Sequence, residues 1–330
     1  METPFLVWIL TIAFILGLLI FDFVSHVRTP HEPTIRESAT WSIVYIAIAV
    51  AFGVGMGVTS GWTTGAEYFA GYLTEKALSV DNLFVFLIIM TSFAVPRSYQ
   101  QKVLLVGIAI ALVSRGLFIA LGVTIIDNFS WVFYLFGVLL FWLAYGQLRG
   151  RHDDSAGESR LVTVLRRIIP TSDDYDADRL TTRVDGRRLF TPLLLVMLAI
   201  GLTDVLFALD SIPAIFGLTQ NAFVVFTANA FSLLGLRQLY FVISGLLERL
   251  VYLAQGLAVI LAFIGLKLVF HALHVNEVPF INGGRAIDWI PEIPIWFSLG
   301  FIVVTILVAT GLSLRESGSA ARADEVTAPE

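Results

Sequence analysis

The stretch Glu75–Phe86, "EKALSVDNLFVF", carries two acidic residues in a run that is otherwise apolar enough to cross a membrane. A second stretch, Thr203–Phe216 ("TDVLFALDSIPAIF"), has the same pattern. In each stretch the two acids are six residues apart, and a polar residue directly follows the second acid. A carboxylate at the centre of a bilayer costs at least about 3 kcal/mol, so acids repeated at matched positions indicate a functional site.

The composition of the chain is that of a membrane protein. Of its 330 residues, 57% are apolar and only 14% are charged, whereas a soluble domain has about 25% charged residues. The chain contains no cysteine, which excludes disulfides, thiolate metal sites and cysteine nucleophiles. We therefore expect an all-α, polytopic membrane protein.

Windows of about 20 mostly apolar residues predict about nine transmembrane helices. These windows are residues 4–24, 41–60, 73–95, 103–126, 131–148, 190–217, 222–247, 250–270 and 295–314. No basic residue precedes the first window, so we expect a retained helix there and not a cleaved signal peptide.

Basic residues set the expected orientation of these helices. Sixteen of the 21 Lys and Arg residues fall in the odd-numbered connections between the predicted helices and in the C-terminal tail, which all lie on the same side of the membrane. Nine of these sixteen are in the loop 149–189, and only Arg285 falls in a connection on the opposite side. The remaining four lie inside predicted helices. Because basic loops stay in the cytoplasm, we expect the N-terminus outside and the C-terminus in the cytoplasm.

The loop 149–189 divides the chain into two similar halves. Each half has three predicted helices: an acidic one, one with a single arginine, and a glycine-rich one. The first half enters from outside and the second from inside, which predicts an inverted repeat of three plus three helices. Such repeats are typical of secondary transporters, whose substrate site lies near the midplane at the repeat interface.

The expected organisation has six parts. They are residues 1–66 (two N-terminal transmembrane helices), 67–148 (first repeat), 149–189 (an Arg/Asp-rich cytoplasmic loop, interpreted as a flexible linker), 190–270 (second repeat), 271–314 (outer loop and last transmembrane helix) and 315–330 (a disordered cytoplasmic tail).

The polar residues of the two acidic stretches predict a metal site made of oxygen atoms. The candidate ligands are Asp81, Asp210, Glu75, Asp204, Asn82 and Ser211. Carboxylate, amide and hydroxyl oxygens suit hard divalent cations such as Mg, Ca and Mn. Protonation of the acids would offset the charge when the ion leaves, which gives a route to proton coupling.

Helix geometry adds one expectation to this site. Two acids six residues apart point about 120° apart on an ideal helix, so both can face one small ion only if the helix is broken. Pro213 is the expected break, because proline has no N–H and displaces the carbonyl of Leu209.

The same charges also allow a purely structural interpretation. Arg115, Arg237 and Lys76 are candidate charge-balancing residues, and bases paired with acids would hold the helices together without any ion. That interpretation accounts for the charge balance but not for the matched six-residue spacing, so we favour an ion site.

Four motifs support a family resemblance over about residues 67–267: "GYLTEKALSVDNLFVF", "FAVP", "DVLFALDSIPAIFGLT" and "LLGLRQLYF". They resemble the TerC family of bacterial integral membrane proteins, which is named for tellurium resistance, includes the Alx proteins and is similar in topology to LysE-like exporters. The resemblance implies a bacterial inner membrane location and metal homeostasis through Mn(II) export. It also implies that the family's motif acids match the four acids named above. Some members carry a glutamate where this chain has Gly201.

Two functions follow as hypotheses. The first is a secondary transporter, not an enzyme, that exports Mn(II) or a similar divalent cation and holds no permanent cofactor. The alternative is a membrane scaffold or accessory subunit of a metal-stress or secretion complex, which would act on metals or tellurite resistance indirectly. An intramembrane hydrolase with two aspartates is a weaker third, because it does not explain the repeat. Expected partners are the metal ion, the lipid bilayer and a second copy or other membrane proteins bound through the loop, but no nucleic acid.

Overall fold

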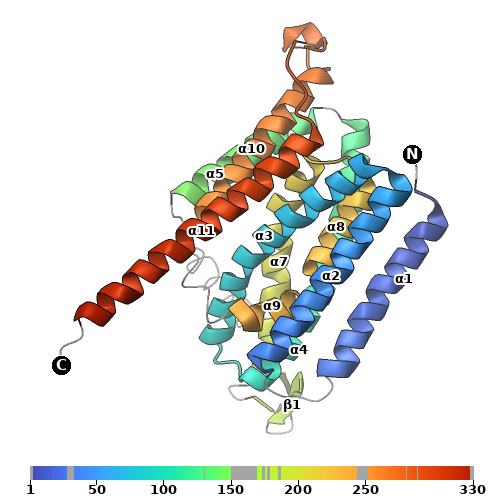
Figure 1. Ribbon diagram of the computed structural model, residues 1–330. Coiled ribbons are helices and arrows are strands. Elements are labelled where there is room, and N and C mark those ends of the chain that lie inside the picture. The colour runs from blue at the N-terminus through green and yellow to red at the C-terminus, as the bar shows by residue number, and fades with distance from the viewer. Residues whose placement is uncertain are drawn as a thin grey trace.

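Long apolar segments of this chain fold as long helices that pack side by side in a computed structural model (Figure 1). The structure describes residues 3–27, 33–129, 131–149, 169–172, 175–176, 179–184, 187–243, 252–279, 281–287 and 289–327. At positions 26, 27, 81, 84, 127, 184, 187, 210, 243 and 317–327 it describes the backbone alone.

The described helices follow the order of the predicted spans. They are α1 (Phe5–Asp22, continued by a π-helical turn, Phe23–Val27), α2 (Ile35–Ser60), α3 (Trp62–Ser92), α4 (Arg97–Asn128), α5 (Val132–Leu148), α7 (Pro192–Phe216), α8 (Ala222–Leu233), α9 (Leu236–Ile243), α10 (Leu253–His274) and α11 (Ile295–Thr327). A short 3-10 helix spans Asn282–Gly284, and strands β1 (Thr181–Val184) and β2 (Arg187–Phe190) form an antiparallel hairpin.

Seven segments of the described chain are long and apolar enough to cross a membrane, which confirms the all-α, polytopic fold. These segments lie in α1, α2, α4, α7, α8 with α9, α10 and α11. Helix α5 has only 17 residues, and α3 carries the charges of the first acidic stretch. The total of nine spans therefore stays a prediction.

The expected single span over 222–247 is two helices, α8 and α9, that meet at Gly235. Gly235 has a φ of +78°, which glycine adopts at no steric cost. A side chain there would also place its Cβ 2.9 Å from the Cβ of Tyr45. The backbone conformation and the packing thus both require glycine at the break.

The prediction of a helix break at Pro213 is wrong, because α7 continues through this proline to Phe216. Pro213 stands in the last turn of the helix, where the hydrogen bond that it removes is one of the last that α7 would make. The break in the second half therefore lies at Gly235, one helix later in the chain.

Packing between the two halves is reciprocal. Helix α4 of the first half packs against α7 of the second, and α8 of the second half packs against α3 of the first. Helix α5 packs along α10, its counterpart in the expected repeat, and α3 also contacts α7. An inverted repeat would produce this exchange of partners, although the repeat itself stays a prediction.

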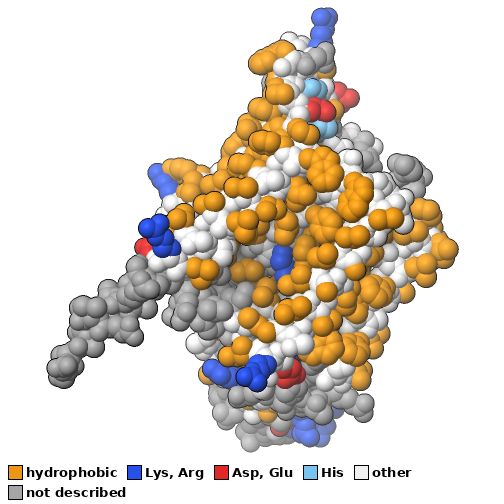
Figure 2. Space-filling model, viewed as in Figure 1, with side chains coloured by type: hydrophobic (Ala, Val, Ile, Leu, Met, Phe, Trp, Pro, Cys, Tyr) orange, Lys and Arg blue, Asp and Glu red, His pale blue; other side chains and the backbone are white. Residues whose placement is uncertain are grey.

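The outer surface of the bundle is apolar. Large exposed side chains such as Phe5 on α1, Trp142 on α5 and Leu307 on α11 point away from the core. Figure 2 shows apolar side chains over most of one face, with charged side chains mainly at its ends and left edge and basic atoms also visible near its middle. A large apolar surface with charged ends suits a protein surrounded by lipid.

Two parts of the chain are more ordered than expected. Within the loop 149–189, the described residues include the β-hairpin, and the Tyr175 hydroxyl donates a 2.7 Å hydrogen bond to the Phe93 carbonyl at the end of α3. The segment expected to be disordered from residue 315 continues α11 as far as Thr327. Its Ala, Arg and Glu residues are good helix formers, and extending an existing helix needs no new nucleus.

The crossing of α5 and α10 generates a stability prediction. A Cβ added at Gly137 would lie 2.6 Å from Val269 Cγ2 and 3.1 Å from the Gly265 carbonyl oxygen. We expect Gly137→Ala to lower the thermal unfolding temperature of the detergent-purified protein. Gly146→Ala on the same helix is the matched control, because nothing lies within 4 Å of its new Cβ and alanine is the better helix former. A Gly137→Ala protein as stable as the control would contradict this packing.

Candidate functional site

A buried arginine joins the acidic stretches of the two halves. Arg115 of α4 donates from Nε and Nη2 to the two carboxylate oxygens of Asp204 on α7, at 3.1 and 3.0 Å. Its Nη1 also donates to Glu75 Oε1 on α3. The three side chains are at most 2% exposed, so each needs the others to offset the cost of burial.

This Glu75–Arg115–Asp204 triad carries more negative than positive charge when both acids are ionised. Glu75 Oε1 also accepts a weak 3.5 Å hydrogen bond from Ser79. Glu75 Oε2 is buried and has no hydrogen-bond partner among the described residues. A carboxylate oxygen left unpaired in a low-dielectric environment favours the approach of a cation.

The depth of the site follows from how α3 and α7 pack. The two helices run in opposite directions (Figure 1), and a Cβ at Gly71 would lie 3.4 Å from Ile215 Cγ2. Four residues deeper along each helix, Glu75 is level with Ser211, since both helices rise about 1.5 Å per residue. Ser211 Oγ is also buried without a hydrogen-bond partner among the described residues.

Further polar groups lie at neighbouring depths. Counting seven residues deeper on the same two helices brings Asn82, which is buried, level with Asp204. Asn229 of α8 follows Ala228, whose Cβ would lie 3.2 Å from a Cβ at Gly71. Both polar atoms of the Asn229 side chain are buried and unpaired within the described part of the protein. The interface between the halves therefore holds several uncommitted neutral oxygens beside the triad.

The expected central ligands, Asp81 and Asp210, have their backbones in α3 and α7, but their side chains lie outside the described structure. Among the side chains that are described, no group of three His, Asp or Glu residues is placed to hold a metal ion. The expected ligand set therefore stays a prediction. Glu75 and Asp204, two of its members, are brought together through Arg115 and not directly.

Lys76 contacts the break between α8 and α9 instead of a described acid. Its ammonium donates to the carbonyl of Ser232 at 2.9 Å and, more weakly, to that of Leu234 at 3.5 Å. The last carbonyls of a helix have no N–H partner within the helix and carry partial negative charge. Lys76 thus satisfies the end of α8 in a region where water is scarce.

The second arginine of the repeat, Arg237, belongs to a different network. It donates to both carboxylate oxygens of Asp22 at 3.1 and 2.7 Å and to Gln101 Oε1 at 2.6 Å. Gln238 Nε2 donates to the same carboxylate at 2.8 Å. Asp22, expected at the membrane interface, is 5% exposed and supplies the counter-charge that Arg237 needs.

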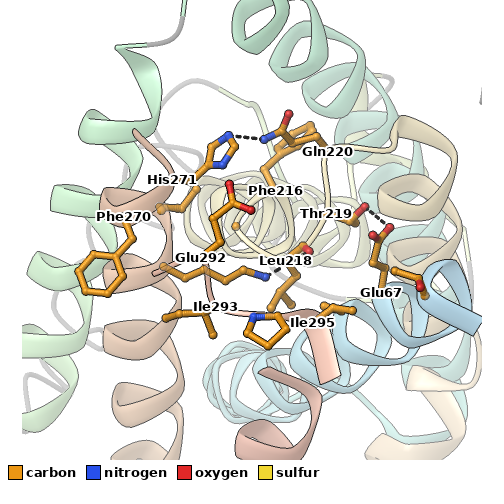
Figure 3. Close-up of a pocket in the computed structure, with 15 residues that line it drawn as sticks. Glu67, Phe216, Leu218, Thr219, Gln220, Phe270, His271, Glu292, Ile293 and Ile295 are labelled. Carbon is orange, nitrogen blue, oxygen red and sulfur yellow. Dashed lines mark hydrogen bonds between the residues drawn. The ribbon is translucent and has the colours of Figure 1, made fainter. Parts of the chain in front are cut away.

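A pocket of about 470 Å³ opens at the predicted outer end of the bundle. Figure 3 shows Glu67, Thr219 and His271 around it. The Thr219 hydroxyl donates to Glu67 Oε2 at 2.6 Å, and the Gln220 amide lies 2.7 Å from His271 Nε2. Glu67 stands two turns before Glu75 on the same face of α3, so the pocket lies outward from the triad.

Sequence reasoning assigned three of these residues other roles. It gave Asn229 an interhelical hydrogen bond, it placed Asp22 at the membrane interface, and it favoured a solvated loop for Glu67 over the alternative of an outer vestibule. The spacing of Glu67, Gly71 and Glu75 at four-residue intervals is the one signal that would have connected the pocket to the acidic stretch.

Gly201, where some family members carry a glutamate, lies in the contact between α7 and α4. A Cβ there would meet Ile110 Cδ1 and Cγ2 at 3.0 Å. The residue therefore permits close packing of these helices, in addition to removing one possible ligand.

The triad generates a prediction about stability. Arg115→Met leaves two buried carboxylates without a partner, and breaking such a pair costs about 3–5 kcal/mol. We expect a large fall in the thermal unfolding temperature, with recovery when Glu75→Gln and Asp204→Asn are added. Arg149→Met, at an exposed arginine that stacks over Tyr145, is the control. Equal unfolding temperatures for the two Arg→Met proteins would show that the triad does not hold the helices together.

Comparison with known proteins agrees with this architecture. The profile of the "Integral membrane protein TerC family" matches residues 60–320. An uncharacterized membrane protein of Mycobacterium tuberculosis is 52% identical over 313 residues, which cover 93% of this chain and 79% of that protein. The "Putative membrane-bound redox modulator Alx" of Escherichia coli is 37% identical over 292 residues, which cover 86% and 85% of the two chains. No solved structure matches. The chain belongs to the TerC family of integral membrane proteins.

Proposed function

We propose that this protein is a secondary transporter that exports a hard divalent metal cation, with Mn(II) as its favoured substrate, through a carboxylate site near the membrane midplane. The observation that carries the proposal is the buried Glu75–Arg115–Asp204 triad, which links the two halves and has surplus negative charge when both acids are ionised. Charges of this kind inside a membrane mark ion pathways. A purely structural network would be more stable with equal numbers of acids and bases.

We propose metal ligands drawn from the helices of this triad and from α8. Asp81 and Asp210, one from each half, are the central ligands, and each follows a triad acid by six residues. The free Oε2 of Glu75 and the side-chain oxygens of Ser211 and Asn229 complete an all-oxygen set. Oxygen ligands suit Mn(II), Mg(II) and Ca(II), and the family resemblance favours Mn(II) and the outward direction.

Transport would proceed by movement of one half against the other. Gly71 lies between Glu67 and Glu75 along α3 and packs near Ile215 and Ala228, so we expect outward release to require these helices to part. Rocking of two halves about a fixed site is the usual mechanism of transporters with inverted repeats. Protons taken up by the vacated carboxylates would restore charge balance and couple export to proton entry.

The Escherichia coli relative is named a putative redox modulator, but the composition of this chain limits how it could act in redox balance. With no cysteine among its residues, the chain has no thiol for disulfide exchange. A redox role would therefore have to run through the ion that it moves.

The test is the manganese content of bacteria that lack the endogenous protein and express variants. We expect the wild type to lower cellular Mn under manganese stress. Asp81→Asn and Asp210→Asn, which each remove a charge from the site, should leave cellular Mn at the level of cells without the protein. Asp176→Asn is the matched control, because this acid lies in the loop and makes only a 3.7 Å surface ion pair with Arg179, of little energetic value.

Wild-type efflux by both site variants would refute the ligand assignment. A scaffold gives a different pattern: deletion of residues 152–180 would abolish the phenotype, while both site variants would keep it. A transporter should retain part of its flux after that deletion.

A further inference from the structure

The outer pocket contains a positively charged side chain of the protein itself, Lys267. Its walls come from α3, from the end of α7 with the segment after it, from α10 and from the segment before α11. Glu67 enters from α3 and Glu292 from the segment before α11, while His271 faces the pocket from α10 (Figure 3). Lys267, one turn before His271 on the same helix, also lines the pocket.

Lys267 lines the pocket together with both acids, and no salt bridge joins it to Glu67 or Glu292. Its ammonium interacts electrostatically with both Glu67 and Glu292. Within the described residues, its one hydrogen bond is a long contact of 3.5 Å to the Leu218 carbonyl. The pocket thus holds a half-buried ammonium with one weak hydrogen bond among the described residues, beside two carboxylates that would also attract a free cation.

The position of the pocket relative to Glu75 indicates a role for Lys267 and the two acids. Glu67 lies about 12 Å outward from Glu75 along α3, at 1.5 Å per residue. An exported ion that passes the contact of Gly71 with Ile215 therefore enters the pocket next. Two carboxylates, a histidine and the Thr219 hydroxyl would bind a divalent cation there if no positive charge were present.

We propose that Lys267 is a tethered cation that competes with divalent metal ions for Glu67 and Glu292 and so keeps the outer pocket from retaining or recapturing the exported ion. The inference rests on the transport function proposed above. The competition is electrostatic, because the ammonium and a divalent ion bound to the same carboxylates would repel one another at close range.

The first experiment measures Mn(II) binding to the detergent-purified protein by electron paramagnetic resonance of the free ion. Lys267→Gln removes the tethered charge, and Lys267→Arg keeps it. We expect Lys267→Gln to bind one more Mn(II) per chain than the wild type, with at least a tenfold gain in affinity at that site. Lys267→Arg should bind like the wild type. Adding Glu67→Gln to Lys267→Gln should remove the extra site.

Two results would overturn the proposal: identical binding curves for Lys267→Gln and the wild type, or an extra site that survives Glu67→Gln. If Lys267→Gln does not give a monodisperse protein, Lys267→Met tests the same loss of charge. This binding experiment does not depend on transport, so it remains decisive even if the wild type moves no metal.

A second experiment uses proteoliposomes with Mn(II) added on the release side. We expect Lys267→Gln to be inhibited at one tenth or less of the concentration that inhibits the wild type, because the ion is retained in the pocket. Active wild-type transport with equal inhibition of Lys267→Gln would overturn the role of Lys267 and leave the proposed transport function intact. Absence of wild-type transport would count against the proposed function alone.

Discussion

The contact of Arg115 with Glu75 and Asp204 is the interaction on which the rest of the bundle depends. One guanidinium satisfies an acid from each half of the chain, and none of the three side chains reaches water. In a membrane interior an unpaired charge is expensive, so the second half can bury Asp204 cheaply only with Arg115 of the first half. Docking of α4 against α7 is thereby coupled to the formation of a buried charged centre.

The arginines at corresponding positions of the two halves have different partners. Arg115 binds the motif acids, whereas Arg237 binds Asp22 of α1. Helix α4 is continuous, whereas its counterpart is broken at Gly235 and its free carbonyls are satisfied by Lys76. The N-terminal helices therefore complete the second half by supplying a counter-ion that the repeat lacks. A similar sequence pattern thus builds two different local structures.

Hydropathy alone predicted the all-α membrane fold, because lipid allows few backbone arrangements. The spacing of the acids predicted that Glu75 and Asp204 act together, but it did not show that Arg115 stands between them, since that depends on how α4 crosses α7. The break was placed at Pro213, the residue most disruptive in a helix interior. Gly235 carries no such signal, because glycine also occurs in unbroken membrane helices. The partner of Arg237 lies 215 residues away in the chain, a separation that no local pattern reveals.

Reconstitution of the purified protein into proteoliposomes tests the central claim most directly. Flux of Mn(II), Mg(II), Ca(II) and Zn(II) would be measured at two opposite pH gradients. The account predicts that Mn(II) moves fastest, that Zn(II), which prefers nitrogen and sulfur ligands, moves slowest, and that reversing the pH gradient changes the rate. Proteoliposomes no more permeable to any of these ions than empty liposomes, at either gradient, would contradict it.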